Sequence, residues 1–445
     1  MRERVHETAL DLDAQLVLAE LAALPPSQDV PYVTVSLDWR PEGSDPGRTP
    51  PPDIRPSERR SHRDNDGVSR RPARQQLDRD LAEAIAQQGP RGAGLESLTA
   101  DAERIATYLD EELDPSAQGV FLVSCAAAAV FAPLALGLPI PTRVSVGPTP
   151  ALSVLARLVD DHPTYAVLLA DQHEATLSLV TQAIHGQSVT LDSTDYPRKQ
   201  KQGGWSQRRF QARADERVAA FARGIAEETQ RALDELGVEM LILAGDEVIT
   251  SALDAAFLQS VKDRIISTLR LDIGAAEQEV IAATLPLAQA AEREREVEAV
   301  QAMSDAVGAG GNAVIGPEAT IMAVQGGQVA MLLITDDFAA AGWADYSFPL
   351  LGVGAPPAAH SAGGDPKAIV PVDLEEELIR LTLLNGGDVQ IVKTASALAA
   401  VDLDEIPVAG LEPPRSATAA ALDAFGGVGA LVRFSVDGQL ENALP

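Results

Sequence analysis

The chain has 445 residues, which at about 100 to 200 residues per domain corresponds to two to four domains and excludes a single small core. Asp and Glu outnumber Lys and Arg by 65 to 35, and the resulting formal charge of −30 disfavours indiscriminate attraction to nucleic acid or anionic membranes. Any contact with RNA must therefore be local. Cys125 is the sole cysteine, which excludes an internal disulfide and a multi-cysteine zinc site and fits a reducing cytoplasm.

The N-terminal third reads as an α/β domain over residues 1–149. Residues 1–7 mix both charge signs and lack the apolar stretch of a secretory signal, so we expect no leader. A stripe of leucines predicts a helix over 10–24, and alternation predicts a strand over 30–37. Residues 41–75 are rich in proline and charge, which predicts a flexible insertion. Its seven arginines between Asp53 and Arg74 either contact RNA phosphates or belong to a solvated loop, and we favour the loop.

The remainder of this domain alternates helices and short strands. Helical periodicity covers 76–89 and 95–113, and strands are expected at 120–123, 130–132 and 144–146, followed by a helix over 150–160. The apolar run 119–138 approaches the length of a membrane span, but Ser124, Pro133 and Gly137 interrupt it. We therefore predict two buried strands around a bend and no membrane segment.

A middle domain is predicted over residues 150–274. Three successive strands, 165–171, 175–181 and 188–191, read as an antiparallel meander. A polar stretch without periodicity follows, and then a long amphipathic helix over 207–236 and a short buried strand over 240–245.

The C-terminal domain is predicted over residues 275–445 as an α/β sandwich. Helices are expected at 276–288, 290–307 and 373–384, with another starting at 316, and strands at 329–335, 388–393 and 429–434. The mixed charges of 292–296 read as a solvated helix face, and the Gly- and Pro-rich stretch 352–366 reads as a mobile loop. The fold class is thus α/β (α+β), with three domains.

One compact basic segment opposes the acidic character of the whole chain. Between residues 198 and 214 there are six cations and no acid. The cations are Arg198, Lys199, Lys201, Arg208, Arg209 and Arg213. Among them lies Gly203-Gly204-Trp205-Ser206-Gln207, at the mouth of the predicted long helix. Glycines allow close approach of backbone to a ligand, and the N–H groups of a helix N-terminus favour phosphate or a developing oxyanion.

The side chains of this segment suit an RNA ligand. Arg208 and Arg209 could hold phosphates, Trp205 could stack on a base, and Gln207 has both a donor and an acceptor to order a water molecule. The alternative is a surface loop in which Ser206 caps the following helix. The crowding of cations, paired glycines and an aromatic in one connection favours the functional interpretation.

The segment from Tyr196-Pro197-Arg198-Lys199 to Gly203-Gly204-Trp205-Ser206-Gln207-Arg208-Arg209-Phe210 resembles the signature loop of a known family. These are the bacterial proteins related to archaeal and eukaryotic peptide-chain release factors, and the loop is also similar to the Gly-x-x-Gln loop of eukaryotic tRNA hydrolases. The residues around Gly316 and the ending Gly426-Gly427-Val428-Gly429 are similar to the C-terminal domain of that family. The resemblance covers 150–445, whereas residues 1–149 match only in domain order.

This resemblance implies a catalytic loop that enters the peptidyl-transferase centre. It assigns Gln207 to the placement of a water that attacks the peptidyl-tRNA ester, with Gly203 and Gly204 letting the loop fit, and Trp205, Ser206 and the six cations binding RNA. It also implies an RNase-H-like middle domain and a C-terminal α/β/α domain of the ribosomal RNA-binding type, which often contacts a translational GTPase. Trp205 and Ser206 separate the glycines from the glutamine, unlike the contiguous Gly-Gly-Gln of archaeal and eukaryotic release factors.

Two functions remain open from the sequence. The first is peptidyl-tRNA hydrolysis in ribosome rescue or quality control, independent of a stop codon, because residues 1–149 carry no codon-reading motif. The second is a non-catalytic hibernation or stress factor that occupies the tRNA site and uses the loop as an anchor. Both imply ribosome and tRNA as partners in the cytoplasm, without DNA or a membrane. The histidines have no metal spacing and His173 reads as a turn residue, so we expect no metal or cofactor.

Overall fold

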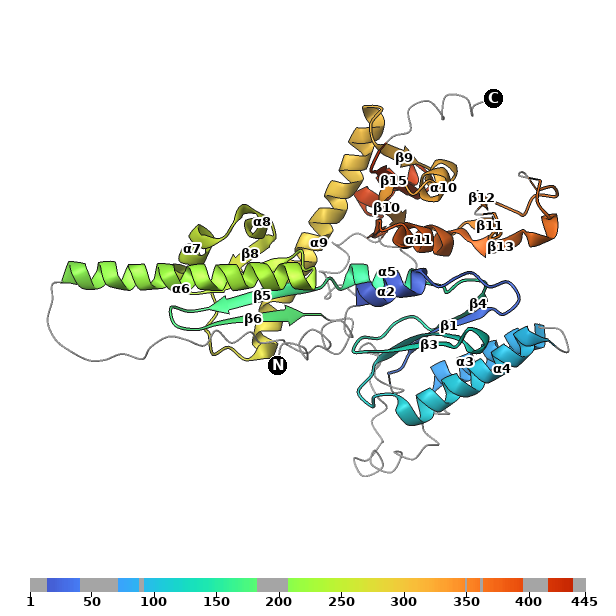
Figure 1. Cartoon of the computed structure of the whole chain (residues 1–445), viewed down its shortest axis with the longest axis horizontal. Helices are drawn as coiled ribbons and strands as arrows, with labels where there is room; N and C mark the ends of the chain where they lie inside the picture. Colours follow the sequence, from blue (N-terminus) through green and yellow to red (C-terminus); the bar gives the residue numbers. More distant parts are fainter. Residues whose placement is uncertain are drawn as a thin grey trace, which may run out of the picture. The chain divides into compact units, whose positions relative to one another are not determined.

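The structure is a computed structural model that describes residues 14–40, 71–87, 92–181, 207–348, 350–360, 363–394 and 415–434. The chain divides into two compact units, the first within residues 161–294 and the second formed by 14–160 together with 295–445 (Figure 1). Both units combine helices with β-sheets, which confirms the predicted α/β class. The division into domains 1–149, 150–274 and 275–445 stays a prediction.

The first unit is built on a four-stranded sheet of order β6-β5-β7-β8. Its strands are β5 (Tyr165–Ala170), β6 (Ala175–Val180), β7 (Leu241–Gly245) and β8 (Ile265–Leu269). β5 and β6 form the predicted antiparallel hairpin, whereas β7 is parallel to both β5 and β8. Parallel neighbours need a crossover, and α6 (Gln207–Leu236) and α7 (Glu247–Ala256) provide two of them. The predicted strand at 188–191 lies outside the described residues.

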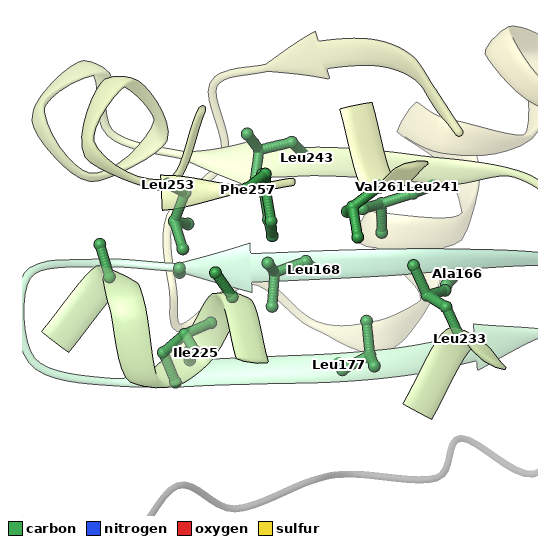
Figure 2. Packing of buried hydrophobic residues seen from close by; sticks show 14 of the residues in the cluster. Ala166, Leu168, Leu177, Ile225, Leu233, Leu241, Leu243, Leu253, Phe257 and Val261 are labelled. Carbon is green, nitrogen blue, oxygen red and sulfur yellow. The ribbon is translucent and has the colours of Figure 1, made fainter. Parts of the chain in front are cut away.

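Both faces of this sheet are buried, which explains its continuous apolar strands. Alternate residues of β5 contribute to different cores: Leu168 belongs to the cluster with α6 and α7, and Val167 to the cluster with α9 (Glu277–Gly308). Figure 2 shows the first cluster, in which Ile225 and Leu233 of α6 lie beside the sheet residues. The long helix is therefore held to the sheet by its apolar stripe.

A buried hydroxyl pair joins this sheet to α9. Tyr165 Oη lies 3.0 Å from Thr284 Oγ1, both side chains are fully buried, and burial raises the pKa of Tyr165. Thr284 Oγ1 itself donates to the carbonyl of Val280 at 2.8 Å, so the tyrosine is the donor of the pair.

We expect Tyr165→Phe to lower the free energy of unfolding by about 1 kcal/mol, because a buried hydrogen bond is lost while the ring is kept. Thr284→Val should cost more, since it leaves the tyrosine hydroxyl buried without its acceptor, and the double variant should cost less than the sum. Urea unfolding of the four proteins measures the coupling. Strictly additive effects would show that the two hydroxyls do not interact.

The N-terminal part of the second unit carries an antiparallel sheet of order β3-β2-β1-β4. Its elements are α2 (Ala14–Ala22), β1 (Tyr32–Asp38), α3 (Pro72–Gln87), α4 (Ala93–Thr107), the π-helix η3 (Tyr108–Glu112), β2 (Gly119–Cys125), β3 (Val130–Leu136), β4 (Arg143–Gly147) and α5 (Ser153–Asp161). The apolar run 119–138 forms the β2–β3 hairpin, as predicted. Pro133 is tolerated because β3 is an edge strand and needs no outward N–H bond. Cys125 is a fully buried core residue.

The C-terminal part of the second unit has two sheets, of order β14-β10-β15-β9 and β12-β11-β13. Its strands and helices, after the end of α9, are β9 (Ala313–Ile315), α10 (Pro317–Gln325), β10 (Val329–Thr335), β11 (Ala341–Asp345), β12 (Leu350–Val353), β13 (Val370–Asp373), α11 (Leu374–Leu384), β14 (Asp388–Val392), α12 (Ala417–Asp423) and β15 (Val428–Val432). The predicted strands and the helices at 316 and 373 are confirmed. The three-stranded sheet was not predicted, because its strands are short and interrupted by glycine and proline.

Three local predictions are wrong. Helix α3 begins at Pro72, inside the insertion predicted for 41–75, because proline suits the first helical turn. Residues 41–70 lie outside the described residues. The helices predicted at 276–288 and 290–307 form one helix, α9, which continues through Pro286.

Glu296 is the third correction, because it does not lie on a solvated face. It is buried, accepts a hydrogen bond from Thr418 Oγ1 at 3.0 Å, and its pKa is raised by burial. The stretch predicted as a mobile loop, 352–366, includes the end of β12 and the buried His360, whose Nε2 lies 2.7 Å from Asp345 Oδ2.

None of the described helices is both long enough and apolar enough to cross a bilayer.

Candidate functional site

The predicted site lies partly before and partly after residue 207, where the described residues resume. Seven of them lie outside the described residues: Arg198, Lys199, Lys201, Gly203, Gly204, Trp205 and Ser206. The other four, Gln207, Arg208, Arg209 and Arg213, lie in the first two turns of α6, where the structure describes the backbone. The roles of these eleven residues therefore stay predictions.

Helix α6 begins at Gln207 and ends at Leu236, as predicted from its periodicity. Its first turn contains no acidic residue and carries Arg208 and Arg209. The first N–H groups of a helix lack intrahelical acceptors, and the positive end of the helix dipole disfavours a cation there by about 0.3 to 1 kcal/mol. Helix stability alone would not select arginines at this place. The backbone N–H groups at this helix end favour an anion, and the two arginines that the sequence places there add positive charge.

The anchored part of α6 lies away from that end. Among its described side chains, which start at residue 216, Val218 is the first to pack on the core, followed by Phe221 and Ala222. Figure 1 shows the N-terminal end of α6 extending past the ends of β5 and β6. The eleven residues from 207 to 217 span about 16 Å at 1.5 Å per residue. The start of α6 thus lies about 16 Å along the helix from the first described side chain that packs on the core.

An aspartate follows each of the parallel strands β5 and β7, and each of these aspartates accepts backbone N–H groups of the residues after it. Asp246 caps α7 by accepting the N–H groups of Val248 and Ile249 at 2.8 and 3.0 Å. Asp171 accepts the N–H groups of His173 and Glu174, each at 2.7 Å, which confirms His173 as a turn residue. In the part of the chain that the structure describes, no group of His, Cys, Asp and Glu side chains is arranged to hold a metal ion.

A cluster in the second unit was missed from the sequence. Glu375, Glu376 and Glu377 open α11, and all three are buried. Glu377 accepts hydrogen bonds from Thr149 Oγ1 and Tyr346 Oη, each at 2.7 Å. Acids in a first helical turn usually face solvent and favour the helix dipole, so the burial of these three was not predicted. Three successive acids before an apolar stripe are the one signal that could have been followed.

Residues 150–289 match the family model described as bacterial archaeo-eukaryotic release factor family 10. Through these residues the chain is related to the archaeal and eukaryotic release factors. This release-factor-related segment contains the four strands of the first unit, α6 and the whole basic segment 198–213. The predicted resemblance is therefore confirmed over residues 150–289, and its extension to residue 445 stays a prediction.

Three solved structures are similar to the chain, with low sequence identity and low TM-scores. An archaeal translation termination factor, aRF1, has 14% identity and a TM-score of 0.22, covering 94% of this chain and 98% of its own. Dom34 of S. cerevisiae has 12% identity and a TM-score of 0.35, with coverages of 72% and 80%. Archaeal Pelota, from a model of ribosome-bound Pelota and ABCE1, has 16% identity and a TM-score of 0.36, with coverages of 68% and 72%. No curated protein sequence matches the chain.

Proposed function

We propose that the chain is a ribosome-associated, release-factor-like protein that hydrolyses the ester of peptidyl-tRNA in rescue or quality control, without reading a stop codon. The observation that carries this proposal is the family match over residues 150–289, because it spans the basic segment and Gln207. The arginines in the first turn of α6 support it, since they concentrate positive charge at one end of this helix, in a chain whose formal charge is −30.

The chemistry needs no metal or covalent intermediate. An ester can be hydrolysed when a water is held against its carbonyl carbon, above the plane of the ester, and the oxyanion is stabilised. In this proposal Gln207 positions the water, Gly203 and Gly204 let the backbone approach, and Arg208 and Arg209 bind RNA phosphates. Partners would be ribosome, tRNA and a translational GTPase in the cytoplasm.

The decisive experiment measures release of labelled peptide from ribosomes that carry peptidyl-tRNA and an empty decoding site. We expect Gln207→Ala to lower the release rate about 100- to 1000-fold, the cost of removing a group that acts in the transition state. Gln211→Ala is the matched control, because it removes the same side chain one turn further along α6. Its release rate should stay within about threefold of the parent, and equal losses in both variants would argue against a special role for Gln207.

The separation of the glycines from Gln207 by Trp205 and Ser206 favours a second candidate, a non-catalytic factor that anchors in the tRNA site. Ribosome sedimentation at increasing salt separates the candidates. Binding without release by the parent protein would support the anchor. Absence of any salt-sensitive ribosome binding would contradict both.

A further inference from the structure

Strand β12 forms one edge of the three-stranded sheet, and β11 is its single neighbour among the described strands. The N–H of Gly354 donates to the carbonyl of Ala341 at 2.8 Å, which makes these two residues a hydrogen-bonded pair. In the antiparallel register of β11 with β12, such pairs recur at every second residue. Gly352 therefore bonds to β11, whereas the N–H and C=O groups of Leu351 and Val353 point away from the sheet.

Other sheet edges in the described part of the chain carry features that discourage pairing with a foreign strand. β3 contains Pro133 and β13 contains Pro371, and neither residue has an N–H to donate. At β14 the N–H of Ile391 is already bonded to Asp160. The four residues of β12, Leu350–Val353, include no proline and no charge, and their pairing with β11 is regular. The edge of β12 thus lacks the features that guard these other edges.

The surroundings of this edge are uncharged. Residues 346–364 contain no Asp, Glu, Lys or Arg, although these residues make up 22% of the chain, so the stretch departs from the acidic character of the rest. Phe348, which shortly precedes β12, is 47% exposed, and Val353 is half-buried. The cores of protein interfaces are depleted of charge and enriched in aromatic residues. The composition around β12 is therefore typical of a contact surface.

We propose that the outer edge of β12 binds an extended segment of another protein, which adds to the β12-β11-β13 sheet as a fourth strand. Backbone donors and acceptors that alternate along an edge are matched by a second strand. A second copy of this chain is disfavoured as the partner, because each copy carries a formal charge of −30. The same charge favours a segment with an apolar centre and Lys or Arg on its flanks. This inference does not depend on the proposed hydrolysis.

Trp343 gives this edge a means of selecting its partner. It pairs with Gly352 in the register, and a Cβ atom at Gly352 would lie 2.4 Å from Cε2 of the indole, so the ring lies over the glycine. On an added strand, the side chain opposite Gly352 would stand on the same face of the sheet, beside this ring. An apolar side chain suits that position, whereas a charged one would be desolvated there without a partner.

Binding can be measured with a fluorescent peptide in which valine alternates with threonine and a pair of lysines stands at each end. With the full chain we expect saturable binding by fluorescence anisotropy, and a change in tryptophan emission that is lost in Trp343→Phe. The same peptide with a proline at its centre should bind about 10-fold more weakly, because it lacks a donor to the edge.

Val353→Pro tests the edge from the side of the protein. It removes an outward N–H and leaves the bonds to β11, since proline is tolerated where the N–H of an edge strand faces outward. The affinity for the valine–threonine peptide should fall about 10-fold. Val353→Thr is the matched control, because it keeps the N–H and the branched side chain, and its affinity should stay within about twofold of the parent. Leu258→Lys, which removes a 60% exposed apolar side chain of the first unit, should also match the parent.

Absence of saturable binding to the parent would overturn the proposal, and so would equal affinities of the parent and Val353→Pro. The proline-centred peptide tests the same bonds on the parent protein, so the conclusion does not rest on how well Val353→Pro folds. Analytical ultracentrifugation of the parent alone addresses the other occupant. A concentration-dependent dimer that Val353→Pro abolishes would assign the edge to a second copy and overturn the assignment to a different protein.

Discussion

Replacing Gly245 with alanine is expected to destabilise the first unit by about 3 to 5 kcal/mol, a cost typical of a substitution that cannot be accommodated. Gly245 ends β7 with a φ of 148°, a conformation that L-amino acids rarely adopt. A Cβ atom there would lie 2.0 Å from the carbonyl oxygen of Ala170 in the neighbouring parallel strand. Neither backbone can move without breaking the pairing of β5 with β7.

A matched control is available on α6. Gly224 lies on the exposed side of the helix, and a Cβ atom there would have nothing within 4 Å. Gly224→Ala should therefore stabilise the helix by about 0.5 to 1 kcal/mol. Hydrogen exchange of peptides that cover β5 and β7 measures both effects in the full chain. Parent-like protection in Gly245→Ala would show that the strand and the following turn differ from the structure described above.

Raising the pH from about 5 to 8 is expected to weaken the second unit by up to about 3 kcal/mol through Glu375. Burial raises the pKa of this carboxyl from 4.5 to about 7, aided by Glu376 and Asp373 and only partly offset by Arg157. A folded-state pKa above the unfolded value means that the folded state holds the proton more tightly. The stabilisation is complete below pH 4.5 and is lost as the pH rises through about 7.

Glu375→Gln should remove this dependence and unfold at a higher urea concentration than the parent at pH 8, because the amide has no charge to desolvate. The intrinsic fluorescence of the full chain can follow unfolding, with Trp39 and Trp343 reporting on the second unit. Equal slopes of stability against pH in the two proteins would mean that Glu375 stays ionised beside Arg157 throughout this range.

The elements predicted best are those whose burial requires a regular pattern of apolar residues along the chain. Strand β10 and helix α6 have the predicted bounds, because an unbroken apolar run and a 3.6-residue stripe each end at clear polar or glycine residues. β7 was found because it is short, apolar and closed by Gly245. Such signals are local, so no knowledge of the partner element is needed.

The elements that were missed depend on partners distant in sequence. Glu296 and Glu376 look like ordinary solvated acids until Thr418, Ser153 and the start of α5 are brought to them by the fold. Pro286 suggests a helix end, yet α9 continues, since tertiary packing can hold the turns on either side of a proline. For the basic segment the sequence remains the guide, since its loop and side chains lie outside the described residues.

The anchoring of α6 has a mechanical consequence. Gln207 begins α6 about 16 Å along the helix from Val218, the first described side chain that packs on the core, so a tilt of roughly 5° about Val218 would move the helix start by about 1.4 Å. Misplacement by about 1 Å can cost 100-fold in a reaction that depends on alignment. In the proposed reaction, the alignment of Gln207 would then depend on how firmly the residues from Val218 onward hold α6 to its sheet.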